Sequence, residues 1–161
     1  MVTLPHPIAV VAHDIRSAHN VGSIFRTADS AGLAHVYLSG FSATPDHRGV
    51  IKTALGAQDA VPWTQVDDLP TLLRQIDAQG FTVAALERTD DTIAPSEVRS
   101  SHFPLALVLG NEVTGVPPEV LDHVELVIGL PQYGVKASLN VSVAFGVAAY
   151  GLVSRFREGS S

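Results

Sequence analysis

The segment LPQYGVKASLNVSVA, residues 130–144, joins a short apolar run to the most apolar helical stretch of the chain. Its proline and glycine predict a loop, and the loop ends on Ser138 and Asn140, which are both good helix-capping residues. One capping residue is enough for one helix. The second, together with Lys136, fits either an ordinary polar loop or the wall of a ligand pocket, and the segment alone leaves both interpretations open.

The helix that follows is predicted to begin at Ser138 or Asn140 and to end near Phe156. It is apolar almost all round, and alanines and glycines at positions 144, 146, 148, 149 and 151 allow a neighbour to approach closely. A helix of this kind is buried on more than one side, either in the core or against a second subunit.

Hydrophobic runs alternate with helical patterns along the rest of the chain, which predicts an α/β fold with a mostly parallel sheet covered by helices. The expected strands are residues 8–12, 35–38, 61–63, 81–86, 105–109 and 126–130. The expected helices are residues 20–31, closed by Gly32, a short helix through residues 51–55 that ends at Gly56, residues 69–79, and a short helix from Pro117 or Pro118 to about His123.

The 161 residues, of which 46% are hydrophobic, suit one compact domain, and we expect residues 1–161 to form a single domain. The sequence has no leader-like segment and no apolar run long enough to cross a bilayer, so we expect a soluble cytoplasmic protein. The absence of cysteine excludes disulfides, thiolate metal sites and cysteine nucleophiles. The seven histidines lack metal-ligand spacing, and no metal is expected.

The net charge of −6 argues mildly against a nucleic-acid partner, because neutralisation of phosphates holds most such proteins to RNA. The acids are concentrated in the middle of the chain, where residues 57–135 carry twelve acids and three Lys or Arg. Residues 1–56 carry four Lys or Arg against three acids, and residues 136–161 carry three against one. If the two ends meet in the fold they form a less acidic face, although ordinary scatter of surface charge explains the pattern equally well.

Three polar clusters follow predicted strands, where the ligand sites of open α/β sheets gather. They are residues 20–26 (NVGSIFR), 109–115 (LGNEVTG) and 130–140 (LPQYGVKASLN). Taken singly, the first two have plain explanations: Asn20 or Ser17 caps a helix, Arg26 forms a surface ion pair, and the second cluster is a turn. The signature loops of dehydrogenases, nucleoside triphosphatases, serine hydrolases and zinc peptidases are absent from the sequence.

Together and in this order, the clusters resemble the three signature motifs of the SpoU/TrmH family within the SPOUT class of RNA methyltransferases. Residues 20–26 are similar to its N-x-G-x-x-x-R motif, residues 109–115 to its L-G-N-E-x-x-G motif, and residues 130–144 to its P-x-x-G-x-x-x-S-L-N-V-S-V-A motif. Residues 52–57 (KTALGA) resemble a further stretch common in these enzymes. The chain departs from the pattern at Val113, where many members have glycine, and at Gln132 and Tyr133, which replace a methionine and a small residue.

The resemblance implies an α/β fold whose C-terminal part is threaded into a trefoil knot, and a homodimer with its sites near the subunit interface. It also implies S-adenosylmethionine as the cofactor, bound within the knot. Gly110, Ile128, Leu130 and Leu139 are the residues expected to line the cofactor site. We recognise no N-terminal RNA-binding extension of the kind found in several ribosomal-RNA members, which favours transfer RNA over ribosomal RNA as the substrate.

The implied reaction is methyl transfer to a ribose 2′-hydroxyl of structured RNA. By their motif positions, Arg26 is the central catalytic residue, and Asn20, Glu112, Ser138 and Asn140 assist it. A guanidinium is a poor general base because it stays protonated. Arg26 therefore either clamps the phosphate beside the target ribose, while that phosphate or water accepts the proton, or becomes an acceptor itself in a crowded cationic site. We favour the clamp, with Glu112 orienting Arg26 or an amide.

The cations expected to contact the RNA are Arg16, Arg48, Lys52 and Lys136. Two other functions compete with this one. The first is a knotted module that binds S-adenosylmethionine or RNA without turnover, and the presence of all five candidate catalytic residues argues against it. The second is a small-molecule methyltransferase, which the net acidity favours. We expect no membrane partner.

Overall fold

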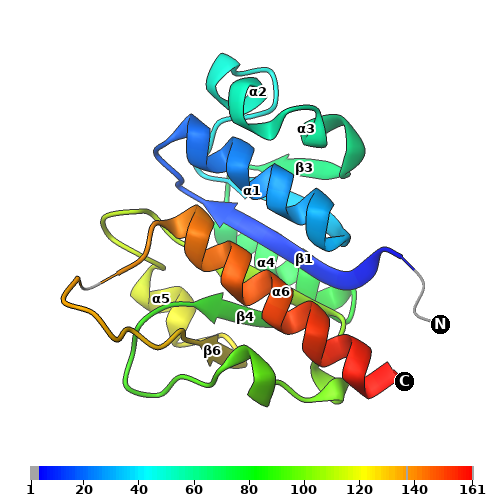
Figure 1. Ribbon diagram of the computed structural model, residues 1–161, viewed down its shortest axis with the longest axis vertical. Coiled ribbons are helices and arrows are strands. Elements are labelled where there is room, and N and C mark those ends of the chain that lie inside the picture. The colour runs from blue at the N-terminus through cyan, green and yellow to red at the C-terminus, as the bar shows by residue number, and fades with distance from the viewer. Residues whose placement is uncertain (1–3, 137, 161) are drawn as a thin grey trace.

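Strand β1 (His6–His13) lies near the middle of a six-stranded parallel sheet in the computed structural model, which describes residues 4–136 and 138–160 (Figure 1). The strand order is β3-β2-β1-β5-β4-β6, and every neighbouring pair is parallel. The other strands are β2 (Leu33–Ser39), β3 (Trp63–Val66), β4 (Thr82–Leu86), β5 (Leu105–Leu109) and β6 (Leu126–Ile128). The predicted mostly parallel α/β fold class is thus confirmed.

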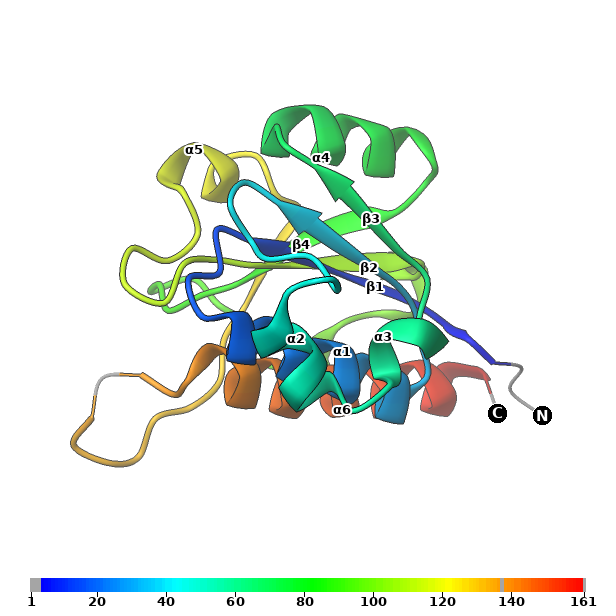
Figure 2. The same cartoon turned by 90° about the horizontal axis from the view of Figure 1, so that it is seen from above.

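Helices cover both faces of the sheet, as Figure 2 shows. One face carries α1 (Ala18–Ala31), α2 (Arg48–Ala54), α3 (Ala57–Ala60) and α6 (Val141–Ser160). The other carries α4 (Leu69–Ala78) and α5 (Pro118–Leu121). Because both faces are covered, the central strands are apolar on both sides: Val10 packs toward α1 and α6, and its neighbour Val11 packs toward α4.

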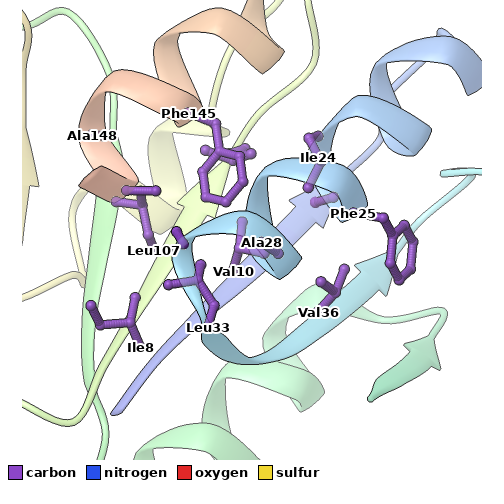
Figure 3. Packing of buried hydrophobic residues seen from close by; sticks show 14 of the residues in the cluster. Ile8, Val10, Ile24, Phe25, Ala28, Leu33, Val36, Leu107, Phe145 and Ala148 are labelled. Carbon is purple, nitrogen blue, oxygen red and sulfur yellow. The ribbon is translucent and has the colours of Figure 1, made fainter. Parts of the chain in front are cut away.

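The larger core lies between the sheet and the α1–α6 pair (Figure 3). Phe145 of α6 and Phe25 of α1 are among the largest fully buried side chains of the described residues. The two ends of the chain meet here, and Arg157 Nη1 donates to His6 Nε2 at 3.2 Å. The two less acidic end segments thus contribute α1, α2 and α6 to one layer, and α4 and α5 of the acidic middle segment lie on the opposite face of the sheet. The middle segment also packs residues Pro95–Glu97 and Ser100–His102 against α6.

The chain order changes direction between β1 and β5, which are neighbours in space although β2, β3 and β4 separate them in sequence. In open α/β sheets, ligands bind beyond the carboxyl ends of strands at such a switch point. The segments that follow β1, β5 and β6 contain the three polar clusters singled out in the sequence. The strand order therefore brings all three clusters to one edge of the sheet.

Several element boundaries differ from the sequence expectation. The strand expected at residues 61–63 lies at Trp63–Val66, because Val61 instead ends α3 and is buried there, and Pro62 has no N–H for a ladder. Helix α1 begins after Ser17, not Asn20, and ends at Gly32 with φ 69°, as predicted. Helix α2 ends at Ala54 and is capped by Leu55, rather than ending at Gly56. Helix α6 begins at Val141 and extends to Ser160. The trefoil knot stays a prediction.

Within residues 4–136 and 138–160, no helix is long and apolar enough to span a membrane. In the same part of the chain, no group of three or more His, Cys, Asp or Glu is placed to hold a metal ion.

Candidate active site

Glu112 holds the start of α1 through three hydrogen bonds. Its Oε1 accepts the Arg16 N–H at 2.8 Å, and its Oε2 accepts the Ser17 N–H at 3.0 Å and the Asn20 Nδ2–H at 2.9 Å. Ser17 is the N-cap of α1, and its side chain accepts the Asn20 N–H at 3.2 Å. The Glu112 side chain therefore acts as an additional cap for this helix end, supplied from beyond β5.

Asn20 connects Glu112 to the third cluster. While its Nδ2 donates to Glu112, its Oδ1 accepts a hydrogen bond from Asn140 Nδ2 at 3.3 Å. Asn140 also caps α6, since its Oδ1 accepts the Ser142 N–H at 2.9 Å. One continuous chain of hydrogen bonds, Glu112–Asn20–Asn140, thus joins all three motifs. Of the two caps that the sequence suggested, Ser17 is the N-cap, and the side-chain amide of Asn20 is free to make this connection.

The pKa of Glu112 lies below its ordinary value. Partial burial acts to raise this pKa, but the hydrogen bonds from Arg16, Ser17 and Asn20 outweigh it and favour the ionised form. An ionised carboxylate with three donors on it is a poor proton acceptor. Glu112 accordingly orients an amide and a helix end, which is one of the two roles that the sequence left open for it.

Two glycines let the loop after β5 fold back on itself. The Gly115 N–H donates to the Asn111 carbonyl at 2.8 Å, and a Cβ added to Gly110 would lie 2.2 Å from the Gly115 carbonyl carbon. The Asn111 side chain fixes the loop from inside, because its Oδ1 accepts the N–H groups of Val113 and Thr114. Its Nδ2 donates to the Asp14 carbonyl at 2.8 Å. The L-G-N-E-x-x-G motif thus builds a rigid turn against the loop that follows β1.

A cavity of about 450 Å³, which we call the first cavity, opens beside this turn. Its apolar lining is Leu86, Leu109, Val113, Leu130, Leu139, Val141 and Ala144, and its other lining residues are Glu87, Arg88, Gly110, Asn111, Glu112, Thr114, Gly115, Gln132, Ser138 and Asn140. Three predicted cofactor residues, Gly110, Leu130 and Leu139, are among them.

The first cavity fits S-adenosylmethionine in size and chemistry. Its volume lies within the range of about 300–1,000 Å³ found for small-molecule sites. Leucines from β4, β5 and the loop before α6 offer apolar surface for an adenine ring, and carboxylates match a ligand that carries positive charge. These residues would hold the cofactor largely through leucine side chains and the backbone of the glycine-rich turn.

Ile128 is placed differently from the expectation. It is fully buried in β6 and is not among the residues that line the first cavity in the described part of the chain. Its carbonyl instead accepts the Glu87 N–H at 3.1 Å. Glu87 does line the cavity and was missed in the sequence, although it follows β4 directly, which is the same signal that singled out the other clusters.

Arg26 lies in a second cavity, of about 490 Å³, between α1, α2 and α6. This second cavity is lined by Ser23, Arg26, Thr27, Ser30, Lys52, Thr53, Leu55 and Tyr150, and among the described residues it shares none with the first. Within one subunit, hydrogen bonds therefore join Asn20, Glu112 and Asn140, whereas Arg26 lines a separate cavity. Ser138 lines the first cavity with Glu112 and Asn140.

The glycine of the first motif explains how Arg26 and Lys52 come together. A Cβ added to Gly22 would lie 1.9 Å from Thr53 Oγ1 and 2.5 Å from the Val50 carbonyl oxygen, so α2 packs directly on the α1 backbone. Thr53 Oγ1 donates to the His19 carbonyl at 2.9 Å across the same contact. The three residues of the N-x-G-x-x-x-R motif therefore have different roles. Asn20 bonds residues that line the first cavity, Gly22 lets α2 pack on α1, and Arg26 lines the second cavity.

The remaining predicted RNA contacts are exposed. Arg16, Arg48 and Lys136 are exposed, and Lys52 is exposed at the rim of the second cavity. Tyr133 on the loop before α6 is 93% exposed, and Val135 is fully exposed. Ala137, in the third motif, lies outside the described residues.

Comparison with known proteins identifies relatives along most of the chain. A model of the SpoU rRNA Methylase family matches residues 7–150. A 23S rRNA (guanosine-2′-O-)-methyltransferase, RlmB of Haemophilus influenzae, is 33% identical over 157 residues, which are 96% of this chain and 62% of that protein. The chain thus spans less than two thirds of this relative.

Solved structures agree with this assignment. An AdoMet-bound rRNA methyltransferase from Sinorhizobium meliloti superposes with a TM-score of 0.84 at 26% identity, over 91% of this chain and 57% of that one. A structure reported for the 2-OH methylation of C/U34 on tRNA has a TM-score of 0.84 at 25% identity, over 96% of this chain and 99% of that one. With its three motifs meeting at one edge of the sheet, the chain belongs to the SpoU rRNA Methylase family.

Proposed function

We propose that the protein transfers a methyl group from S-adenosylmethionine to a ribose 2′-hydroxyl of structured RNA. The observation that carries this proposal is the Glu112–Asn20–Asn140 chain of hydrogen bonds, which joins the three family motifs at the wall of the first cavity. Relatives named as ribose methyltransferases and an AdoMet-bound neighbour support the same reaction. Such a substrate implies a cytoplasmic protein, and one sheet with both faces covered supports a single methyltransferase domain.

Transfer RNA is the favoured substrate. The neighbour reported for methylation of tRNA matches along nearly its full length, over 99% of that chain. The less acidic layer formed by α1, α2 and α6 supports contact with a polyanion, and it contains Arg26, Lys52 and Arg48.

The protein works as a homodimer in this proposal, with the exposed apolar face of α6 as the interface. Val143, Val147 and Tyr150 of α6 are between 51% and 53% exposed, and their spacing places them on one face of the helix. Leu55, 66% exposed, adds to this apolar surface beside the second cavity. A second copy covering it would complete the second cavity and carry Arg26 to the first cavity of its partner.

Different residues of the chain bind the RNA and position the reacting groups for methyl transfer. S-adenosylmethionine, when bound, supplies a methyl group on a positively charged sulfur. Arg26, with Lys52 beside it, clamps the phosphate next to the target ribose, because a guanidinium grips two phosphate oxygens at once. The 2′-hydroxyl loses its proton to that phosphate or to water as it takes the methyl group. Asn20 and Asn140, held by Glu112, fix the geometry in which the hydroxyl meets the methyl group.

Incubation of the purified protein with labelled S-adenosylmethionine and total RNA from a strain lacking the gene tests the proposal. We expect label in transfer RNA at a 2′-O-methyl position that the deletion strain has lost. Label in ribosomal RNA alone would correct the substrate. Cofactor binding with no transfer to any RNA would indicate a binding module, and label in small metabolites a small-molecule enzyme, and either result would overturn the proposal.

A further inference from the structure

Glu87 is a carboxylate fixed in the wall of the first cavity by backbone groups on both sides. Its Oε2 accepts the Val116 N–H at 2.9 Å, and its Oε1 accepts the Arg88 N–H at 2.9 Å. Its own N–H donates to the Ile128 carbonyl at 3.1 Å. The side chain is only partly buried and lines the cavity, so its position is set before any ligand arrives.

The glycine-rich turn leaves room for this carboxylate. Gly115 has φ +73°, and a Cβ added there would lie 2.3 Å from Glu87 Oε2. Any other residue at this position would displace the Glu87 side chain as well as strain the backbone. The last glycine of the L-G-N-E-x-x-G motif therefore leaves the space that the Glu87 carboxylate occupies.

Glu87 and Glu112, the two carboxylates that line the first cavity, differ in how many further hydrogen bonds their oxygens can accept. Glu112 receives three hydrogen bonds, from Arg16, Ser17 and Asn20. Glu87 receives one N–H on each oxygen, and a carboxylate has about four acceptor positions. Each Glu87 oxygen can thus accept one more donor. Two acceptor atoms on one rigid group match two neighbouring hydroxyls, such as the 2′- and 3′-hydroxyls of a ribose.

We propose that Glu87 is a cofactor-binding residue that accepts hydrogen bonds from the ribose hydroxyl pair of the nucleoside in the first cavity. This inference rests on the proposed function, because it assumes that the first cavity holds the methyl donor. A sulfonium has no hydrogen to donate, so it cannot satisfy these acceptors. An ammonium group is the competing donor, and the experiment distinguishes the two.

The test is a cycle of ligand and protein changes, measured as displacement of labelled S-adenosylhomocysteine. Adenosine and 2′,3′-dideoxyadenosine compete for the site in the parent protein and in Glu87→Gln. Glutamine keeps one acceptor oxygen for the Val116 N–H but loses the charge that strengthens bonds to a diol. We expect the parent to prefer adenosine by about 10-fold or more, and this preference to fall to about 2-fold or less in Glu87→Gln, with dideoxyadenosine binding unchanged.

Asp90→Asn is the matched control, because it removes an exposed carboxylate three residues away that does not line the first cavity. It should keep the full preference for adenosine. Thermal unfolding of each variant establishes that it is folded. An undiminished preference in Glu87→Gln would overturn the inference. So would equal weakening of both nucleosides, which indicates a structural role, or weaker binding of the labelled S-adenosylhomocysteine while adenosine binding is unchanged, which indicates the ammonium group.

This outcome is separable from the proposed function. If the parent methylates RNA but the cycle shows no coupling between Glu87 and the hydroxyls, only the inference fails. If the cycle shows coupling but no RNA accepts a methyl group, the reaction assigned to the protein is wrong while the role of Glu87 stands.

Discussion

Asn140 Nδ2 donates a hydrogen bond to Asn20 Oδ1 at 3.3 Å, although the two residues are 120 positions apart in the sequence. The contact places the start of α6 beside the start of α1, on one side of the first cavity. Glu112 completes the arrangement by holding the other end of the Asn20 amide at 2.9 Å. Three asparagine and glutamate side chains therefore align the two helices that form the main core with the sheet.

The stability of this arrangement should depend on pH through Glu112. Its folded-state pKa is depressed, so its contribution is fully present above the ordinary value of 4.5 and is lost as the pH falls through the folded value. We expect Glu112→Gln to lower the free energy of unfolding at pH 7, and the gap between parent and variant to narrow steadily below about pH 4.5. Urea unfolding of both proteins between pH 7 and pH 3 measures the gap. A gap of constant size would contradict the assignment.

Arg26 is expected to act on RNA and not on the cofactor. Arg26→Ala should reduce methyl transfer by about 10³-fold or more while the affinity for S-adenosylmethionine changes less than about 2-fold. Arg26→Lys should also fail, because lysine cannot grip two phosphate oxygens in a fixed fork. Arg74→Ala, on α4 at the opposite face of the sheet, is the control and should keep full activity. Full activity in the lysine variant would exclude the clamp, and full activity in the alanine variant would exclude any essential role.

The α6 surface should determine the oligomeric state. Val147→Glu places a charge in the middle of the exposed apolar face formed with Val143 and Tyr150, and burial of an unpaired charge is costly. We expect the parent to sediment as a dimer and the variant as a folded monomer without methyltransferase activity. Gln75→Glu, exposed on α4 at the opposite face of the sheet, should sediment like the parent. A monomeric parent would refute the dimer.

Mixing two inactive variants tests whether the site is shared between subunits. Arg26→Ala lacks a residue of the second cavity, and Asn140→Ala lacks one of the first. If Arg26 serves its partner, a mixed dimer has one intact site, and random exchange of subunits should restore about a quarter of the parent activity. The activity is measured after joint refolding of equal amounts. No recovery above that of the separate variants would place both residues in the site of one chain.

Gly22 and Gly146 give opposite expectations for the same substitution. At Gly22 an added Cβ would lie 1.9 Å from Thr53 Oγ1, so Gly22→Ala should destabilise the protein by about 1–3 kcal/mol. At Gly146 the nearest atom is Thr27 Cγ2 at 3.9 Å, and Gly146→Ala should be neutral or stabilise α6 by up to about 1 kcal/mol. Chemical unfolding of both variants measures the difference. Equal stabilities would contradict the close packing of α1 on α2.

The sequence predicted the sheet well because its central strands are continuous apolar runs bounded by loops. The prediction was wrong at β3, which was expected at residues 61–63 because Val61 is apolar. Val61 is indeed buried, but the strand begins at Trp63, and Trp63 and the two residues after it are exposed. Periodicity reports burial, and a strand at the edge of a sheet has little of it.

The candidate site could be predicted in part. The motif order identified Asn20, Glu112 and Asn140, but the spacing could not show that Glu112 bonds the Asn20 amide, because that contact spans 92 residues. Glu87 belongs to none of the motifs, and its place in the cavity depends on the fold around Gly115. The separation of Arg26 from the first cavity depends on where the three-dimensional fold places α1 and α2, and the order of the motifs does not show it.

The backbones of Gly110 and Gly115 lie in direct contact beside the first cavity, and this contact restricts which amino acids can replace them. No side chain fits between these two residues, where a Cβ would lie 2.2 Å from a carbonyl carbon. Tyr133 and Val135, on the loop before α6, have almost their whole side chains in solvent. Replacement of residues 133–135 therefore disturbs no packing in this structure, whereas Gly110 and Gly115 tolerate almost no replacement, so a change of RNA contact on this loop would leave the glycine-rich turn beside the donor site intact.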